Sequence, residues 1–471
     1  MVSELNASLP LVIITAAGLV TLCVDAFVKR SLVIQWWVAL VGLACAGVAG
    51  WLSIPSSGQA FGGMMNTGGS AGYWSSVFSV AGFLATALSR GYLERHDIAH
   101  GEYYTLLLFG TAGMVLMGAA GDLIIFFLGL ELMSLCFYVL AGFARTTQTS
   151  NEAALKYFLL GAFATGFLLY GIALVYGSTG TTQIRLIHES VAQHASDPIL
   201  LIGLGLLVIG LAFKVAAVPF HMWVPDVYEG APTTVSAFMS TGGKAAAFSV
   251  FLLVFSPSFV TIMHPVRDAI AAVSALSMIV GNVLAISQTS VKRMLAYSSI
   301  AHAGYILSGI VGANATGSEG VLFYLLAYTL MNCGAFGVLA LEETEKGEHL
   351  TFEEFRGYGT VKPVSAFLMS LFMFSLAGVP PFAGFFGKYY VFAGAIQGGY
   401  TWLAILGVLM SVVSVYYYLR LVVVMYFSEG AALPVQRASV PGMIALCVAA
   451  AALTGFGIFP SVIVSATRLL F

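Results

Sequence analysis

The chain has 471 residues, of which 59% are hydrophobic and only 8% are charged. A soluble globular protein carries about 25% charged residues, so this composition excludes a soluble enzyme and indicates an integral membrane protein. The net charge of −2 provides no basic surface, so we expect no binding to nucleic acid. The apolar segments are continuous over about 20 residues, as in membrane helices, whereas the strands of a membrane barrel alternate over about 10.

Fourteen apolar segments follow one another along the chain. Their approximate ranges are 8–28, 31–52, 73–93, 102–120, 122–144, 152–177, 199–224, 232–257, 266–288, 293–313, 319–341, 363–397, 401–427 and 439–468. Because the start of the chain carries Glu4 and no positive charge, the first segment is a retained span rather than a signal peptide. The connection 181–198 mixes polar and apolar residues, so we expect it to lie along the surface.

The loops differ in positive charge. Those after odd-numbered segments contain twelve of the 19 lysines and arginines, whereas those after even-numbered segments, with the chain end, contain only Arg185, Arg267 and Arg468. Positively charged loops stay on the cytoplasmic side of a membrane. The count therefore predicts that both termini lie on the outer, periplasmic side of a bacterial inner membrane.

Two of the segments pair a proline break with a lysine. Lys214 precedes the sequence VPF at 218–220, and the sequence VPPF at 379–382 precedes Lys388. These breaks lie five spans apart, and an odd offset reverses direction across the membrane, so the sequence predicts two inverted five-helix repeats, each with a broken helix. The predicted parts are an N-terminal three-helix segment (1–101), a first repeat (102–258), a second repeat (259–428) and a C-terminal helix (429–471).

Glu131 and Lys214 lie near the middle of their segments, where a charged side chain is expensive and is usually functional. Together a glutamate and a lysine both stay charged, and apart they tend toward their neutral forms. A pair with a variable separation is therefore a proton switch, and we expect Lys214 to be the partner of Glu131. The alternative is a permanent ion pair that only packs two helices.

Three further ionisable residues lie inside apolar segments, namely Lys244, His302 and Lys388. Lys244 is about 12 residues from either end of its segment, which disfavours the alternative that it snorkels to the surface. His302 relays protons or is a hydrogen-bonded structural histidine. Lys388 follows the second break and would serve a second half-channel. Polar groups that would carry a water chain, or only join helices, are Tyr305, Tyr324, Tyr328 and Asn332.

Three stretches of the chain resemble the antiporter-like membrane subunits of respiratory complex I, NADH–quinone oxidoreductase. They are Phe213–Thr233, Ser290–Tyr305 and Leu376–Tyr390, and the resemblance covers essentially the whole chain. Within the first stretch, PDVYEGAP (Pro225–Pro232) is expected of the subunit N group. The sister subunits and the multisubunit cation/proton antiporters differ here, after a shared PFH.

The resemblance implies a set of proton-transfer residues. The glutamate of the fifth helix corresponds to Glu131, and the lysines of the seventh, eighth and twelfth helices correspond to Lys214, Lys244 and Lys388. His302 matches a polar position on the same central axis, which in the family is a hydrated line at the membrane midplane. The implied partners are a neighbouring antiporter-like subunit, small membrane subunits and the lipid bilayer.

These observations predict a proton-translocating subunit of NADH–quinone oxidoreductase, and thus part of an enzyme without a redox centre of its own. No nucleotide-binding loop, metal-ligand spacing or catalytic triad occurs in the chain, so we expect it to bind no nucleotide, flavin or iron–sulfur cluster. The resemblance implies that NADH, FMN, iron–sulfur clusters and quinone are bound by partner subunits. The alternative function is a subunit of a multisubunit cation/proton antiporter, which PDVYEGAP disfavours. A purely structural scaffold would leave the lysines inside the spans without a reason.

Overall fold

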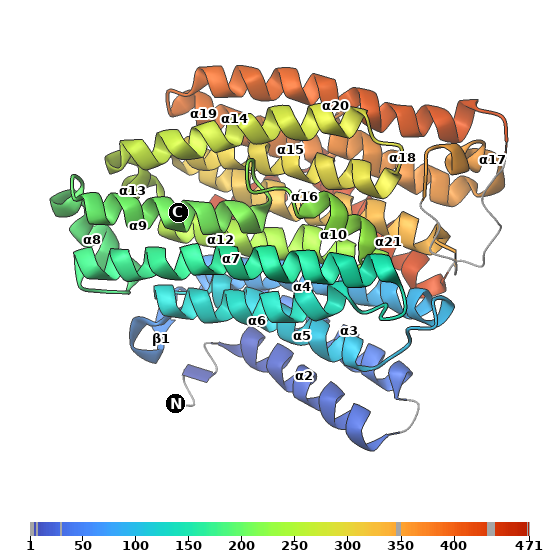
Figure 1. The fold of residues 1–471 in the computed structure, drawn as a ribbon, viewed down its shortest axis with the longest axis horizontal. Coiled ribbons are helices and arrows are strands. Elements are labelled where there is room, and N and C mark those ends of the chain that lie inside the picture. Colours follow the sequence, from blue (N-terminus) through green and yellow to red (C-terminus); the bar gives the residue numbers. More distant parts are fainter. Residues whose placement is uncertain are drawn as a thin grey trace.

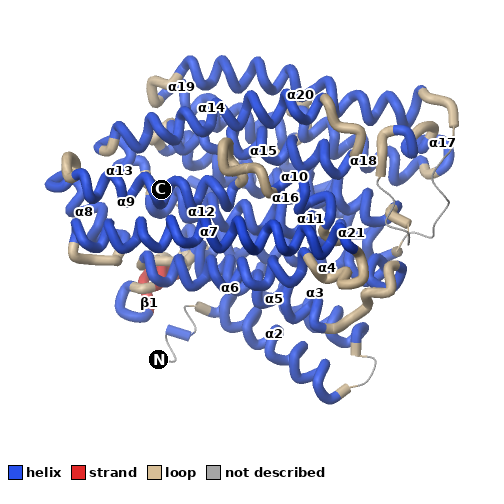
Figure 2. Tube along the Cα trace, viewed as in Figure 1, coloured by secondary structure: helices blue, strands red, loops and turns tan. Residues whose placement is uncertain are grey.

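The computed structural model describes residues 4–5, 8–28, 31–344, 350–430, 439–468 and 470. The long helices lie side by side with their axes roughly aligned, close to horizontal in Figure 1. Helices dominate the described chain, and a short hairpin of β1 (Gly58–Ala60) and β2 (Met65–Thr67) lies at one end (Figure 2). Four of the charges counted in the loops, Lys29, Arg30, Lys346 and Arg437, lie outside the described residues.

The elements before residue 255 contain the first proline break. They are α2 (Leu9–Phe27), α3 (Leu32–Ser53), η1 (Phe61–Gly63), α4 (Gly69–Arg95), α5 (Glu102–Gly118), α6 (Leu123–Ala141), α7 (Gln148–Thr179), α8 (Ile184–His194), α9 (Pro198–Val215), α10 (Val224–Gly230), α11 (Thr233–Phe238), the π-helical turn η2 (Met239–Gly243) and α12 (Lys244–Val254).

The elements after residue 255 contain the second break. They are α13 (Pro257–Ile262), α14 (His264–Ile286), α15 (Val291–Val311), α16 (Ala315–Glu342), η3 (Glu353–Phe355), α17 (Tyr358–Val361), α18 (Pro363–Ala377), α19 (Ala383–Gln397), α20 (Thr401–Phe427), α21 (Val440–Ile458) and α22 (Ser461–Arg468).

The predicted class, an all-helical polytopic membrane protein, is confirmed. Among the described residues, twelve helices are long and apolar enough to cross a membrane, counting α11, η2 and α12 as one. Both predicted breaks are present, because α9 and α10 are separate helices, as are α18 and α19. The number of fourteen crossings and the inverted relation of the two repeats stay predictions.

The segment predicted to lie along the surface forms α8. Its buried side chains are Ile184, Ile187 and Val191, which recur at helical spacing on one face. The His188 ring also contacts the backbone oxygen of Val254, with 2.9 Å between Nε2 and that oxygen. Helix α8 therefore has one face packed against the bundle and one face exposed.

The centre of the bundle is made of α4, α11–α12, α15 and α16. In each of the last three, 94% of the most apolar window is buried inside the molecule. The outer helices α2, α3, α7, α20 and α21 expose large apolar side chains instead, such as Phe163, Val412 and Val448. Apolar side chains facing outward around a polar-bearing centre are expected of a protein surrounded by lipid.

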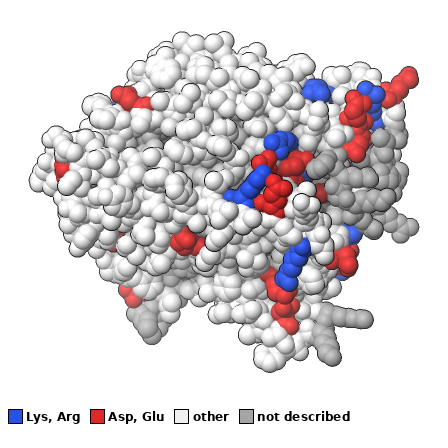
Figure 3. Space-filling model, in the orientation of Figure 1, with Lys and Arg blue, Asp and Glu red and all other residues white. Residues whose placement is uncertain are grey.

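Charged side chains gather at one end of the molecule (Figure 3). On the face drawn, lysines and arginines lie among acidic residues around α10 and α17, toward the right. Asp226 on α10 holds two of these cations, with 3.0 Å to Lys156 Nζ of α7 and 2.9 Å to Arg293 Nη1 of α15. We call this end, which includes Lys292, Glu342, Glu343 and Lys362, the charged end.

Candidate functional site

Lys214 lies in the last turn of α9, directly before the first break. The helix ends where Ala216 adopts a left-handed conformation, with φ at +63°. Backbone groups freed by the break find partners, because Trp223 Nε1 donates to the Phe213 oxygen and Val218 N donates to Ser277 Oγ. Irregular backbone at membrane depth is tolerated only when it is satisfied in this way.

The Lys214 ammonium has neutral neighbours. Its Nζ donates a hydrogen bond of 2.8 Å to Ser134 Oγ on α6. The rings of Tyr138, Tyr157 and Phe213 have their centroids 5.7, 5.9 and 5.7 Å from Nζ, close enough for cation–π attraction. The lysine is 6% exposed, so protein atoms replace nearly all of its water.

The expected ion pair between Lys214 and Glu131 is not formed in the described structure. Glu131 instead accepts a hydrogen bond of 3.0 Å from Thr165 Oγ1 on α7. Ser134, which accepts from Lys214, lies three residues after Glu131 and so on the same face of α6. The Ser134 hydroxyl, one helical turn after Glu131, therefore lies against the Lys214 ammonium, and the Glu131 carboxylate lies beyond it.

Lys244 begins α12, immediately after the π-helical turn η2. It is 1% exposed, and its Nζ donates to both the backbone oxygen and the hydroxyl of Ser299 on α15. The Tyr328 ring centroid is 6.0 Å away. Single π-helical turns occur frequently at functional sites. The sequence indicated Lys244 but not η2, because Ser-Thr-Gly-Gly does not distinguish a π-helical turn from an α-helical one.

His302 lies in the middle of α15 between two tyrosine hydroxyls. Its Nδ1 is 2.7 Å from the Tyr324 hydroxyl of α16, and its Nε2 is 3.0 Å from the Tyr418 hydroxyl of α20. The Tyr418 hydroxyl also hydrogen-bonds to Ser298 Oγ. Both ring nitrogens thus have partners that can donate or accept, which suits an imidazole that passes protons.

Lys388 lies on α19, just past the second break. Its Nζ donates 2.9 Å to the backbone oxygen of Ala377, the last residue of α18, and 2.7 Å to Ser411 Oγ of α20. The Tyr305 ring centroid is 5.1 Å from Nζ. The turn that allows this contact contains Gly378, with φ at +85°.

The structure arranges the five predicted residues in two groups. The first group is Lys244, His302 and Lys388. His302 lies on α15 one turn from Ser299 and one turn from Tyr305, and Lys244 contacts Ser299 while Lys388 lies over the Tyr305 ring. Glu131 and Lys214 form the other group, around α6, α7 and α9. Within the described residues, no hydrogen bond or ion pair joins one of these side chains to another.

Sequence reasoning missed the hydroxyl groups that hold the charges. They are Ser134, Thr165, Ser299, Ser411 and Tyr418. Each lies inside an apolar helix, where a serine or threonine hydroxyl more often bonds to its own backbone and a tyrosine is an ordinary packing residue, so the sequence alone carries little signal for them. In the described part of the chain, no cluster of His, Cys, Asp and Glu is arranged to hold a metal ion.

Comparison with known proteins identifies the family. Residues 120–414 match the model described as NADH:quinone oxidoreductase/Mrp antiporter, TM. NADH-quinone oxidoreductase subunit N of Trichlorobacter lovleyi is 48% identical over 467 residues, which are 98% of this chain and 95% of that protein. A chain in the structure of respiratory complex I from Thermus thermophilus with bound aureothin is 34% identical, with a TM-score of 0.84 over 97% of this chain and 99% of that chain.

A chain of the Mrp complex from Dietzia has a TM-score of 0.86 over 99% of this chain and 97% of that chain. At 20% identity this likeness shows a shared fold alone. The family model and the relatives that match over nearly their whole length decide the assignment. The chain belongs to the NADH:quinone oxidoreductase/Mrp antiporter family, and within it to the group of NADH-quinone oxidoreductase subunit N.

Proposed function

We propose that this chain translocates protons as subunit N of an NADH–quinone oxidoreductase in a bacterial inner membrane. The observation that carries the proposal is the set of three buried lysines held by hydroxyl and carbonyl oxygens rather than by carboxylates. A carboxylate next to a buried lysine would strongly favour the charged form of the lysine, whereas a neutral oxygen favours the charged form less. Lysines in such surroundings are suited to gaining and losing protons.

In this proposal, Lys214, Lys244 and Lys388 are the groups that hold protons. Glu131 tunes Lys214 across Ser134 of α6, while Thr165 of α7 holds the Glu131 carboxylate in place. His302 connects the surroundings of Lys244 with those of Lys388, because it shares α15 with Ser299 and Tyr305. The residues 102–258 form one half of the pathway and the residues 259–428 form the inverted second half.

The redox chemistry belongs to partner subunits. These would bind NADH, FMN, iron–sulfur clusters and quinone, and their reaction would drive the change of charge in this chain. The neighbours in the membrane are another antiporter-like subunit and small membrane subunits. By the positive-inside rule, the charged end faces the cytoplasm and both termini face the periplasm.

The test is proton pumping by the intact complex carrying Lys244→Met. Methionine approximates the lysine stem without a charge, and apolar replacements of buried charges are often tolerated by the fold. We expect normal assembly and at least a tenfold loss of NADH-driven pumping in inverted membrane vesicles. The matched control is Lys156→Met, which removes a lysine with 41% of its side chain exposed.

Two outcomes decide the matter. Assembly with full pumping in Lys244→Met would contradict the proposed function of this lysine. If the variant pumped protons normally only when sodium was present, exchange of sodium for protons would replace redox-driven proton translocation as the proposed function.

A further inference from the structure

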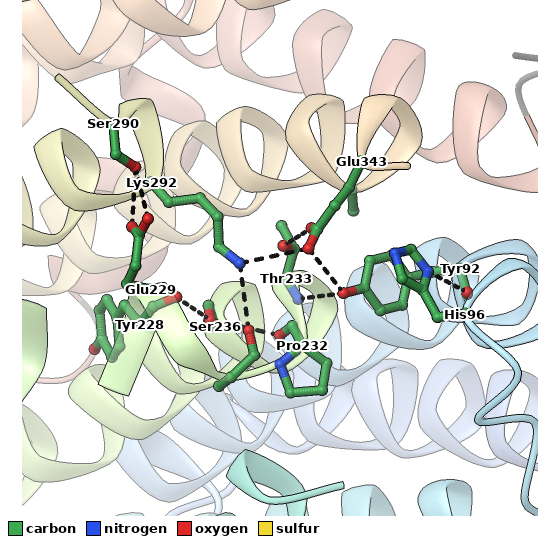
Figure 4. Close-up of polar contacts among 12 residues, drawn as sticks. Tyr92, His96, Tyr228, Glu229, Pro232, Thr233, Ser236, Ser290, Lys292 and Glu343 are labelled. Atoms are coloured by element: carbon green, nitrogen blue, oxygen red, sulfur yellow. Dashed lines mark hydrogen bonds and ion pairs between the residues drawn. The ribbon is translucent and has the colours of Figure 1, made fainter. Parts of the chain in front are cut away.

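A buried carboxylate lies where four elements meet at the charged end (Figure 4). Glu343, the residue that follows α16, is 7% exposed. Its oxygens accept from Thr233 Oγ1 at the start of α11 and, at 3.3 Å, from the Tyr92 hydroxyl of α4. Lys292 of α15 lies 3.8 Å from Oε1 and also donates, at 3.3 Å, to the backbone oxygen of Ala231.

This ion pair differs from the one next to it. Glu342, one residue earlier, is 2.5 Å from Lys362 Nζ, a contact short enough to be a strong charge-assisted hydrogen bond. Lys292 is farther from Glu343 and is shared with a backbone carbonyl. The charge of Glu343 is therefore compensated mainly by hydroxyl donors, which remain good partners when a carboxylate takes up a proton.

A row of polar side chains leads from this carboxylate into the membrane. Thr233, Ser236, Ser240 and Lys244 are spaced by three, four and four residues, so they share one face of the continuous helix formed by α11, η2 and α12. All four are at most 1% exposed. At 1.5 Å per residue, the row is about 16 Å long.

The π-helical turn η2 lies within this helix and directly precedes Lys244. Neighbouring members of the row are one turn apart, which is about 5–6 Å between Cβ atoms. That separation is bridged by one water molecule between two hydroxyls.

Buried polar atoms surround the inner end of the row. Oδ1 of Asn332 has no hydrogen-bond partner in the described structure, and the hydroxyls of Tyr228 and Tyr328 are also buried in the bundle. Both hydroxyls lie near Ser299, the residue that holds Lys244, and Asn332 Nδ2 donates to Ser240 Oγ at 2.8 Å. Buried polar groups without protein partners are the groups that ordered water satisfies.

We propose that Glu343 takes up protons at the charged end and delivers them to Lys244 along the Thr233–Ser236–Ser240 face. This inference rests on the proposed function and names the entry point for its Lys244 group. A proton from the aqueous side binds a Glu343 oxygen. It leaves toward Thr233, each hydroxyl passing on one proton as it receives another, until the neutral amine of Lys244 becomes an ammonium and Glu343 is again a carboxylate.

A purely structural role of Glu343 is the competing explanation, since the residue also ties α4 and α11 to α15 and α16. The charged and titratable groups that face it are Tyr92 and Arg95 from α4, His96 directly after α4, Lys292 from α15, and Glu342 with Lys362 beside it. A test must therefore measure proton uptake and its pH dependence as well as assembly.

The experiment compares Glu343→Gln with Glu342→Gln in the intact complex in inverted vesicles. Each change removes one buried carboxylate from one ion pair at the charged end. We expect Glu343→Gln to lower the rate of NADH-driven pumping at least fivefold at pH 8, and the loss to deepen as pH rises, because uptake then depends on bulk protons. Glu342→Gln should keep the wild-type rate and pH profile, and Glu343→Asp should restore most of the rate.

Equal rates and pH profiles for Glu343→Gln and Glu342→Gln, with pumping lost in Lys244→Met, would overturn this inference and leave the proposed function intact. Normal pumping in Lys244→Met would overturn both. If Glu343→Gln does not assemble, Thr233→Val removes one hydroxyl of the row at constant shape. A pumping rate of Thr233→Val that is slowed, and slowed more as pH rises as expected for Glu343→Gln, supports the inference. A wild-type rate overturns it.

Discussion

Lys388 is held by two acceptors that carry no full charge, the Ala377 carbonyl and the Ser411 hydroxyl. An arginine at this position would keep the positive charge and the hydrogen-bond donors. It would not release a proton, because the guanidinium stays protonated at any pH a protein tolerates. Replacement by arginine thus separates holding a charge from exchanging a proton.

We expect Lys388→Arg to leave assembly largely intact and to reduce NADH-driven proton pumping at least tenfold. The measurement is the initial rate of vesicle acidification per NADH oxidised. Lys156→Arg is the control, because that lysine is exposed and paired with Glu152 and Asp226. A Lys388→Arg complex that pumps as fast as the control would show that this position only needs a cation.

At the residue scale, the sequence identified the charges but not their partners. Lys214, Lys244 and Lys388 were recognisable because a lysine inside an apolar run has a large cost. The pairing of Lys214 with Glu131 as a switch of variable separation stays a prediction, and the sequence could not show which side chain touches the lysine, because that depends on helix rotation and packing. Ser134, one helical turn after Glu131, makes the contact with Lys214 instead.

At the element scale, both broken helices place a lysine at a helix C-terminus. Lys214 is in the last turn of α9, and Lys388 donates to the final carbonyl of α18. The C-terminal end of a helix carries about half a negative charge from its unpaired carbonyls. Each break thus supplies electrostatic stabilisation to an ammonium without a carboxylate, which explains why proline breaks and lysines occur together in this chain.

Gly378, at the end of α18, tests this arrangement. A Cβ there would lie 3.0 Å from Lys388 Cδ and 3.3 Å from its Nζ, and φ is +85°. We expect Gly378→Ala to displace Lys388 and lower pumping severalfold, with a stability loss of about 1–3 kcal/mol from backbone strain. Gly399→Ala is the matched control, because its φ of +89° gives the same strain with no atom within 4 Å. Equal pumping in the two variants would contradict the proposed role of this turn.

The positions of the helices could be predicted from hydropathy and the breaks from proline, since both signals are local. The π-helical turn η2 and the hairpin of β1 and β2 could not be predicted. The hairpin lies in a connection rich in glycine and serine, and it pairs through backbone bonds that carry no side-chain pattern. Such features depend on contacts with distant parts of the chain, such as Gly121, whose amide donates 2.9 Å to the Met64 oxygen.

At the scale of the whole molecule, the exposed lysines and arginines on the face drawn in Figure 3 gather at the charged end, and few charges, such as Arg185 beside Glu189, lie at the opposite end. This distribution predicts orientation, which labelling of single cysteines can measure in a background without the native cysteines. We expect Thr146→Cys, exposed between α6 and α7 at the charged end, to react with an impermeant maleimide in inverted vesicles only. Gln59→Cys, exposed on β1, should react in right-side-out cells only. The reverse pattern would invert the proposed topology.

The polar face that ends at Lys244 has a consequence for the electrical response of the protein. Its length of about 16 Å is roughly half of the 30 Å hydrocarbon thickness, so a proton that travels along it crosses about half of the transmembrane voltage. One elementary charge crossing 100 mV changes energy by about 2.3 kcal/mol. Uptake to Lys244 would then respond to membrane potential by about 1.15 kcal/mol per 100 mV, about a sevenfold change in the ratio of charged to neutral lysine.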